Sequence, residues 1–225
     1  MKVLITSGAT QEPIDQVRFI TNFSTGSTGA LIADHFRSKG HQVVYLRGIG
    51  ASSPPSSPEI EEIEYTDFSD LDSKIRTVLR SGQIHAVIHA AAVSDYSVAS
   101  VEFDGQPRVP RVLQKIESRA GDVVLRLKRN FKILARLKSY SPEKLRVVGF
   151  KLTNTSNAAE RRLAIQAVAK PSEVDYVVHN DYSDIREKRR QFTLFKVTEE
   201  GPVELVDADS QLRLAQVLAE ELDHF

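Results

Sequence analysis

The segment STGSTG, residues 24–29, holds residue types that can bind an anion, and it directly precedes the helical pattern ALIADHF. Backbone N–H groups at a helix start are unpaired and carry partial positive charge, so a phosphate is a suitable ligand. Arg18 and Asn22 lie just upstream, where a guanidinium can pair with an anion and an amide can bond to an acyl group. The same cluster is also typical of a plain N-cap, and the local pattern leaves both interpretations open.

A second group of candidate residues follows two predicted strands, at SGATQEP (7–13) and HAAAVSDY (89–96). Ligands of open α/β sheets bind beyond the carboxyl ends of the strands, where the strand order reverses. Small side chains at 90–92 would let a base or ribose approach the backbone, and Asp95 could meet a sugar hydroxyl or a metal. Alternatively, the alanines pack a helix against the sheet and Asp95 caps a turn.

The glycines are separated in an unusual way. In a dinucleotide-binding turn they follow the first strand at once. Here Gly8 closes the first strand, whereas Gly26 and Gly29 come only after a long inserted segment.

The elements that must position these residues alternate between strand and helix. Strands are predicted at 2–8, 42–48, 60–66, 86–93, 146–152 and 175–181, and helices at 29–41, 69–82 with Ser69 as N-cap, 157–170 and 208–225. This pattern predicts a Rossmann-like, doubly wound, mainly parallel sheet with helices on both faces, and residues 192–206 predict a C-terminal β-hairpin. The α/β alternation resumes after the low-complexity stretch 48–58, so residues 1–225 are expected to form a single domain.

Composition excludes several classes of function. Thirty basic and thirty acidic residues give zero net charge, so no overall field would recruit nucleic acid or a membrane surface. The chain has no cysteine, which excludes disulfides and thiolate zinc sites. Its apolar runs fall far short of the roughly 20 residues that a membrane span requires, and we expect a cytoplasmic protein.

Taken together, the motifs resemble one family. ITSGATQEPIDQVRFITNFSTGSTGALIA looks like the signature of phosphopantothenate–cysteine ligases, and AAAVSDY, KIES, NFKIL, VVGFKL and VHND follow in that family's order. The resemblance covers residues 2 to about 181 and is strongest to the short stand-alone bacterial form. It implies a homodimer that uses CTP, in preference to ATP, with Mg²⁺. Phosphopantothenate would be activated as an acyl-cytidylate with loss of pyrophosphate, and the amine of cysteine would then attack.

The resemblance also assigns roles to residues. It implies catalytic roles for Asn22, which would hold the acyl intermediate, for Lys115, which would contact the nucleotide phosphates, and for Arg18 in the second step. The implied nucleotide-binding positions are Gly8, Ala91, Ala92, Asp95, Lys115, Asn130, Phe131, Lys132, Ile133, Leu134, Phe150 and, as a looser match, Lys170. The substrate phosphate and acyl group would be held by Asn22, Ser24, Thr25, Gly26 and Gly29. The metal ligands stay undetermined.

The chain departs from the family at several lysines. The corresponding positions hold Ser27, Glu117, Ser118 and Gln166. Phosphate neutralisation could then depend on Lys132, Arg161 or Arg162, and Arg119 could compensate within the KIES segment. His179 replaces the usual alanine before Asn180, and we interpret it as a core residue rather than a substrate contact.

Two further expectations concern whole segments. Residues 95–122 interrupt the alternation with a polar, glycine-bearing stretch, which predicts a mobile cover over the nucleotide. The segment between Gly8 and Gly26 is expected to hold the acyl end of the substrate.

Two alternative functions remain. YSPEK, Tyr140 to Lys144, formally satisfies the Tyr-x-x-x-Lys pattern of NAD(P)-dependent short-chain reductases. Pro142, however, suits the first turn of a helix with Ser141 as its cap, which would leave Tyr140 outside that helix. A non-catalytic nucleotide-binding protein is the other alternative.

Overall fold

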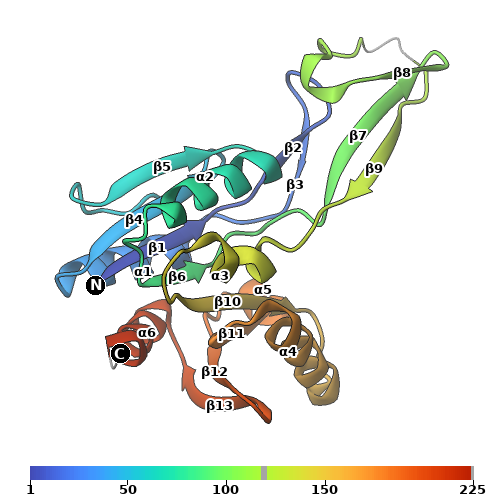
Figure 1. Ribbon diagram of the computed structural model, residues 1–225. Coiled ribbons are helices and arrows are strands. Elements are labelled where there is room, and N and C mark those ends of the chain that lie inside the picture. The colour runs from blue at the N-terminus through green and yellow to red at the C-terminus, as the bar shows by residue number, and fades with distance from the viewer. Residues whose placement is uncertain (118–120, 224–225) are drawn as a thin grey trace.

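Eight strands form the central sheet of the computed structural model, which describes residues 1–117 and 121–223 (Figure 1). The strand order is β13-β12-β11-β10-β6-β1-β4-β5. Neighbouring strands are parallel from β11 to β5, while β12 and β13 form the antiparallel hairpin at one edge. Their bounds are β1 Lys2–Ser7, β4 Gln42–Gly48, β5 Glu61–Tyr65, β6 Ala86–His89, β10 Arg146–Thr153, β11 Tyr176–Asp181, β12 Phe192–Thr198 and β13 Gly201–Ala208. The predicted α/β fold with its C-terminal hairpin is confirmed.

Helices cover both faces of this sheet because alternate strand residues point to opposite sides. Ile5 and Tyr45 belong to one core cluster, together with residues of α1 and α6, whereas Leu4 and Leu46 belong to a second cluster, together with residues of α2, α3 and α4. The helix bounds are α1 Ser27–Ser38, α2 Phe68–Arg80, α3 Leu137–Tyr140, α4 Ala158–Ser172, α5 Tyr182–Arg186 and α6 Gln211–Asp223.

Two small antiparallel sheets project from the carboxyl edge of the central sheet (Figure 1). We call them the arm, which comprises the described residues of 11–21 and 96–129: β2 Gln11–Pro13, β3 Phe19–Thr21, β7 Tyr96–Phe103, β8 Gln106–Arg108 and β9 Val124–Arg129. The arm has its own small apolar cluster around the buried Val98, Val101 and Ile116. Within the described residues, the predicted cover over 95–122 thus contains the strands β7 and β8, and its mobility stays a prediction.

Two details of the sequence interpretation were wrong. The N-cap of α2 is Asp67 rather than Ser69, because the extended Asp67 accepts a hydrogen bond from the backbone N–H of Asp70. The helix near Tyr140 precedes Pro142 instead of following it, since α3 ends at Tyr140 and Ser141 is extended. Within the described residues, no helix is both long and apolar enough to cross a membrane.

Candidate functional site

The strand order reverses between β1 and β6, and the residues that leave these two strands lie side by side. The backbone N–H of Ala92 donates to the carbonyl of Gly8 at 2.8 Å, and the N–H of Thr10 donates back to Ala92 at 3.3 Å. In the sheet, β4 and β5 lie beyond β1 on one side of this point, and β10 and β11 lie beyond β6 on the other. This is the switch point at which α/β sheets bind ligands.

The glycines of the inserted segment return to this point. Gly26 has a φ of 80° and precedes α1, and a Cβ on it would lie 3.6 Å from the backbone nitrogen of Gly8. A Cβ on Gly29 would lie 2.4 Å from the Oγ of Ser7, so α1 can approach β1 this closely only with glycine there. The inserted segment between Gly8 and Gly26 therefore forms the β2–β3 hairpin, and the glycines on either side of it still meet in a compact turn.

The start of α1 is open to an anion. Its N-cap is glycine, so no cap side chain bonds to the first-turn N–H groups, and the first turn has no acidic residue. The hydroxyls of Ser27 and Thr28 accept hydrogen bonds from the Nε2 of Gln211 at 3.1 and 2.8 Å, which ties α6 to this helix start. Thr25 contributes only a long contact, 3.4 Å from the N–H of Ser27, and Ser24 lies partly buried beside it. These features favour the anion-site interpretation over a plain cap.

Asn22 reaches the same edge of the sheet. Its Nδ2 donates to the carbonyl of Val93 at 3.4 Å, and the Oγ1 of Thr21 donates to Thr10 at 2.8 Å. The end of β3 is thus fixed beside the exits of both β1 and β6. The structure brings Asn22 to Val93, directly after the Ala90–Ala92 segment, and its contact with the acyl end of the substrate stays a prediction.

Asn130 anchors the foot of the arm. Its side chain bonds to the carbonyl of Ser94 at 3.0 Å and to the Oγ of Ser97 at 2.9 Å, and its N–H donates to the carbonyl of Asp95 at 2.8 Å. Lys132 forms an ion pair with Asp95. Two of the predicted nucleotide-pocket segments, 91–95 and 130–132, therefore meet directly.

Sequence reasoning missed Glu12 in this network. Its carboxylate is 2% exposed, accepts from the Oγ of Ser97 at 2.7 Å and from the N–H of Phe68 at 3.0 Å, and so joins the arm to α2. An isolated glutamate in a strand exit gives no signal of this role, because its partners are distant in sequence.

The hydrophobic residues of the predicted nucleotide pocket mainly pack against neighbouring side chains and so support the pocket. Ile133 is 2% exposed, so any contact that it makes with a ligand must use its backbone. Leu134 packs where a Cβ on Gly149 would stand, 2.8 Å away, and the partly buried Phe150 follows on β10. Phe131 packs edge-on against Phe68 with ring centroids 4.8 Å apart.

A second missed residue, His89, lies at the end of β6. Its Nδ1 is 2.8 Å from the Oγ1 of Thr6, which also accepts from the N–H of Ala91 at 3.3 Å. Burial lowers the pKa of His89 to about 4, so its ring is neutral at physiological pH. The hydroxyl of Thr6 therefore shares one hydrogen bond with Nδ1 and accepts another from Ala91, which fixes the backbone where a base or ribose would approach.

Three predicted residues do not join this group. Lys115 and Arg18 lie on the arm, where the Nη2 of Arg18 donates to the carbonyl of Ile116 at 3.0 Å. Lys170 lies in the last turn of α4, which leads into the amino end of β11, at the sheet edge opposite the switch point. Ser118 and Arg119 lie outside the described residues.

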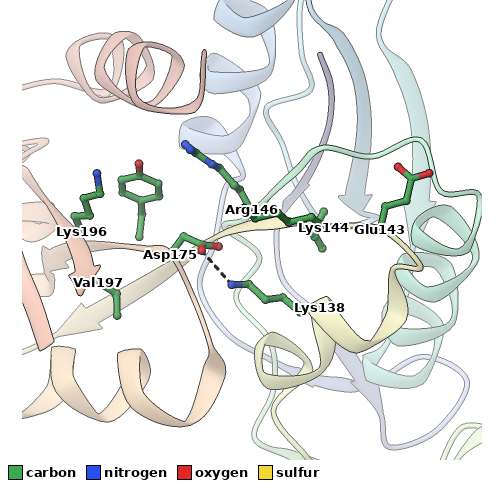
Figure 2. Close-up of a pocket in the computed structure, with 9 residues that line it drawn as sticks. Lys138, Glu143, Lys144, Arg146, Asp175, Lys196 and Val197 are labelled. Atoms are coloured by element: carbon green, nitrogen blue, oxygen red, sulfur yellow. Dashed lines mark hydrogen bonds and ion pairs between the residues drawn. The ribbon is translucent and has the colours of Figure 1, made fainter. Parts of the chain in front are cut away.

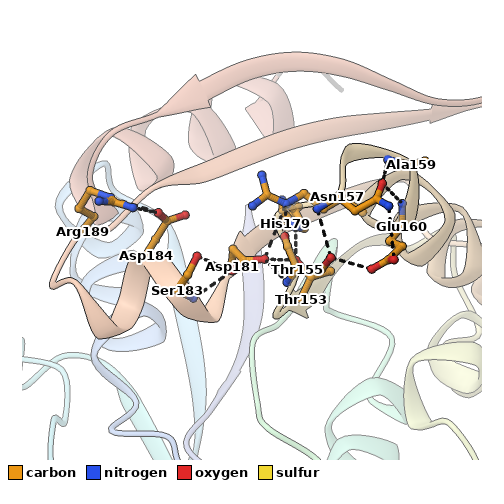
Figure 3. A network of polar contacts seen from close by, with 11 residues as sticks. Thr153, Thr155, Asn157, Ala159, Glu160, His179, Asp181, Ser183, Asp184 and Arg189 are labelled. Carbon is orange, nitrogen blue, oxygen red and sulfur yellow. Dashed lines mark hydrogen bonds and ion pairs between the residues drawn. The ribbon is translucent and has the colours of Figure 1, made fainter.

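The carboxyl ends of β10 and β11 carry a buried polar network (Figure 3). The Oγ1 of Thr153 donates to the Oδ2 of Asp181 at 2.6 Å, so it must accept from the Nε2–H of His179, 2.8 Å away. Burial lowers the pKa of His179, in accord with its interpretation as a core residue. Burial also opposes ionisation of Asp181, but hydrogen bonds from Thr153 and Ser183 outweigh it and hold the pKa of Asp181 well below its usual range.

Arg161, one of the three cations suggested for phosphate neutralisation, reaches this network. Its Nε lies 3.7 Å from the Oδ2 of Asp181 and donates to the carbonyl of Thr155 at 2.7 Å, whereas Arg162 is exposed on α4. Arg161, His179 and Asp181 border a cavity of about 430 Å³.

A separate cavity of about 320 Å³ lies at the amino ends of β10 and β11 (Figure 2). Lys138 lines it and pairs with Asp175 at 3.0 Å. Since ligands of such sheets bind at the carboxyl ends, this cavity is not assigned to the site.

The reductase alternative loses its geometric support. The hydroxyl of Tyr140 donates to the Oδ1 of Asp72 at 2.6 Å, and α3 ends before Lys144. Tyr140 and Lys144 therefore do not share a helix face, and Tyr140 tethers α3 to α2.

Known proteins resemble the chain along its whole length. The family described as DNA/pantothenate metabolism flavoprotein C-terminal domain matches residues 1–225. The coenzyme A biosynthesis bifunctional protein CoaBC of Thermococcus kodakarensis is 31% identical over 225 residues, which cover 98% of this chain and 48% of that protein. Phosphopantothenate–cysteine ligase 1 of Oryza sativa subsp. japonica is 32% identical over 97 residues, or 42% of this chain and 29% of that protein. The chain thus spans less than half the length of these curated relatives.

A solved structure shares the fold. The crystal structure of the DNA/pantothenate metabolism flavoprotein from Streptococcus pneumoniae superposes with a TM-score of 0.82 at 26% identity, covering 100% of this chain and 99% of that one. Because the family matches every residue of the sequence, the chain belongs to the DNA/pantothenate metabolism flavoprotein C-terminal domain family.

Proposed function

We propose that the chain is a phosphopantothenate–cysteine ligase of coenzyme A biosynthesis. The observation that carries the proposal is the return of Asn22, Gly26 and Gly29 to the switch point beside Gly8 and Ala92. A helix start with open N–H groups and an amide then lie at one sheet edge, which suits an anion and an acyl group. Membership of the family and the name of the rice relative support the same reaction.

The first proposed step activates the carboxylate. A carboxylate oxygen of phosphopantothenate attacks the α-phosphorus of CTP, the bond to the β-phosphate oxygen breaks, and pyrophosphate leaves. Both reactants are anions, so positive charge must offset their repulsion. The open N–H groups at the start of α1 and the amine of Lys132 could supply part of that charge.

Mg²⁺ is proposed to enter the site already bound to the triphosphate. Magnesium sites typically use substrate phosphates, water and one or two carboxylates. Asp95, at the switch point, could supply one such carboxylate. Within residues 1–117 and 121–223, no cluster of three or more His, Asp or Glu side chains could hold a metal.

The second proposed step forms the amide bond. The amine nitrogen of cysteine attacks the acyl carbon, CMP leaves, and the nitrogen loses a proton. Asn22 suits this step because its amide can donate to the acyl oxygen and cannot compete as a nucleophile. Its exposed position at the end of β3 leaves room for a substrate.

The proposal includes a homodimer formed through the arm. Large apolar side chains are exposed along the arm at Phe19, Tyr96, Val124 and Leu127, between 46% and 55% of their surface. The family resemblance implies a second copy of the chain as the partner, with residues 95–122 and 176–206 as the flap and the interface, and the exposed apolar side chains favour the arm as part of that interface.

Pyrophosphate release tests the proposed function. The purified chain is mixed with phosphopantothenate, cysteine and either CTP or ATP. We expect release that requires phosphopantothenate and is faster with CTP. Tight nucleotide binding without release would instead favour a non-catalytic nucleotide-binding protein.

A further inference from the structure

Asp15, at the turn of the β2–β3 hairpin, makes contacts that the hairpin alone does not need. Its Oδ1 accepts from the N–H groups of Val17 and Arg18, both at 2.8 Å, which is a local turn motif. Its Oδ2 accepts from the N–H of Ile116 at 3.1 Å, from a segment 101 residues away. The same oxygen lies 3.2 Å from the Nη1 of Arg18.

The segment that Asp15 holds is docked at three points. The N–H of Gln16 donates to the carbonyl of Leu113 at 3.1 Å, and the Nη2 of Arg18 donates to the carbonyl of Ile116 at 3.0 Å. The side chain of Ile116 is 3% exposed and packs in the apolar cluster of the arm, against Ile14 and Ile20 among others.

Lys115 lies between these docked residues and is itself exposed. Its backbone position is therefore set by the contacts of its neighbours, and its amine is free to extend into solvent. The arrangement fixes the backbone position of Lys115, while its long side chain can still move.

Burying the carboxylate of Asp15 costs free energy. Asp15 is 4% exposed, and a buried carboxylate is tolerated only when it is well hydrogen-bonded. The turn itself requires only Oδ1. The second oxygen serves the connection between the hairpin and the segment 113–116.

We propose that Asp15 is a positioning residue that holds the segment carrying Lys115 against the β2–β3 hairpin, so that Lys115 and the foot of the hairpin with Asn22 keep a fixed relation. The inference rests on the proposed function and on the contact with the nucleotide phosphates that the family resemblance implies for Lys115. Asp15 then acts on the activation step through Lys115 and contacts no substrate.

The variant Asp15→Asn separates the two roles of the carboxylate. Its remaining oxygen can accept from Val17 and Arg18 and keep the turn, while the new amide group cannot accept from the N–H of Ile116. We expect hydrogen exchange of the Ile116 amide to become at least about 10-fold faster, and kcat/KM for CTP in pyrophosphate release to fall about 10-fold, since a bond to a charged group is lost.

A double-mutant cycle shows whether the effect passes through Lys115. In a Lys115→Gln background, Asp15→Asn should cause no further fall in kcat/KM. The matched control is Asp104→Asn, the same chemical change on the same arm, at an exposed turn residue whose φ of 52° suits asparagine. It should leave both the exchange of Ile116 and the rate unchanged.

Two results would overturn the inference: unchanged exchange at Ile116 in Asp15→Asn, or an equal fall in rate with and without Lys115. If Asp15→Asn does not fold, Asp15→Ser replaces it, because its hydroxyl can still serve the turn but is too short to reach Ile116. A wild-type chain that released no pyrophosphate would contradict the proposed function, whereas the exchange experiment needs no substrate and decides the Asp15 contact by itself.

Discussion

At the scale of single residues, the candidate site is held by short polar side chains that hydrogen-bond to backbone groups or to one another. Asn22 bonds to Val93, and Thr6 bonds to both His89 and Ala91. Asn22 could be singled out from the sequence through its motif. His89 and Glu12 could not, because burial and partners from distant strands define their roles.

Asn22→Asp should uncouple the two proposed steps. The change is nearly isosteric, but it replaces the amide donor by a carboxylate that repels phosphate and cannot donate to the acyl oxygen. We expect formation of phosphopantothenoylcysteine to fall far more than consumption of CTP. Both rates are measured in one reaction with cysteine present, and a variant whose two rates fell equally would remove Asn22 from the second step.

His89 should make stability depend on pH. Its pKa is lowered to about 4 in the folded chain, against about 6.5 when unfolded, so the unfolded state binds more protons between these values. Stability is therefore full above about pH 6.5 and falls by about 3 kcal/mol as the pH drops to about 4. Denaturant unfolding at several pH values should show a smaller loss for His89→Asn, and an equal loss would contradict a buried neutral ring.

At the scale of elements, the close approach of α1 to β1 brings the segment 24–29 to the switch point. The spacing of apolar residues predicted the strands of the central sheet and the helices α1, α2, α4 and α6, because both periods are local. The short α3 and α5 were not predicted. The arm was not predicted as strands, since β7 pairs with β9 and the hairpin docks on residues far along the chain. Ser69 and Asp67 are both good capping residues, so sequence alone could not place the start of α2.

Gly29→Ala should disturb that close approach. The added Cβ would stand 2.5 Å from the Cβ of Ser7, so the helix start must shift. We expect a loss of about 1–3 kcal/mol in the free energy of unfolding and weaker CTP binding. Adding Ser7→Gly removes the clash and should restore part of both losses. Gly105→Asn is the control, since nothing lies near that glycine and its φ of 70° suits asparagine. A harmless Gly29→Ala would contradict the described contact.

At the scale of the whole molecule, most of the candidate site residues lie at one sheet edge, while an arm with several exposed apolar side chains stands away from the body (Figure 1). Leu127 is 46% exposed on β9, and Leu212 is 50% exposed on α6. If the arm pairs two copies, Leu127→Lys should convert a dimer into single chains, whereas Leu212→Lys should not. Light scattering after size exclusion measures the mass directly. A wild-type chain with the mass of one copy would contradict the proposed dimer.

The most direct test of the proposed reaction follows oxygen atoms. Phosphopantothenate labelled with ¹⁸O in its carboxylate is incubated with the chain, cysteine, Mg²⁺ and CTP, and the products are analysed by mass spectrometry. Attack of the carboxylate on the α-phosphorus should leave one ¹⁸O in CMP for each molecule of phosphopantothenoylcysteine formed. Label found in inorganic phosphate or pyrophosphate, or no phosphopantothenoylcysteine at all, would contradict the account.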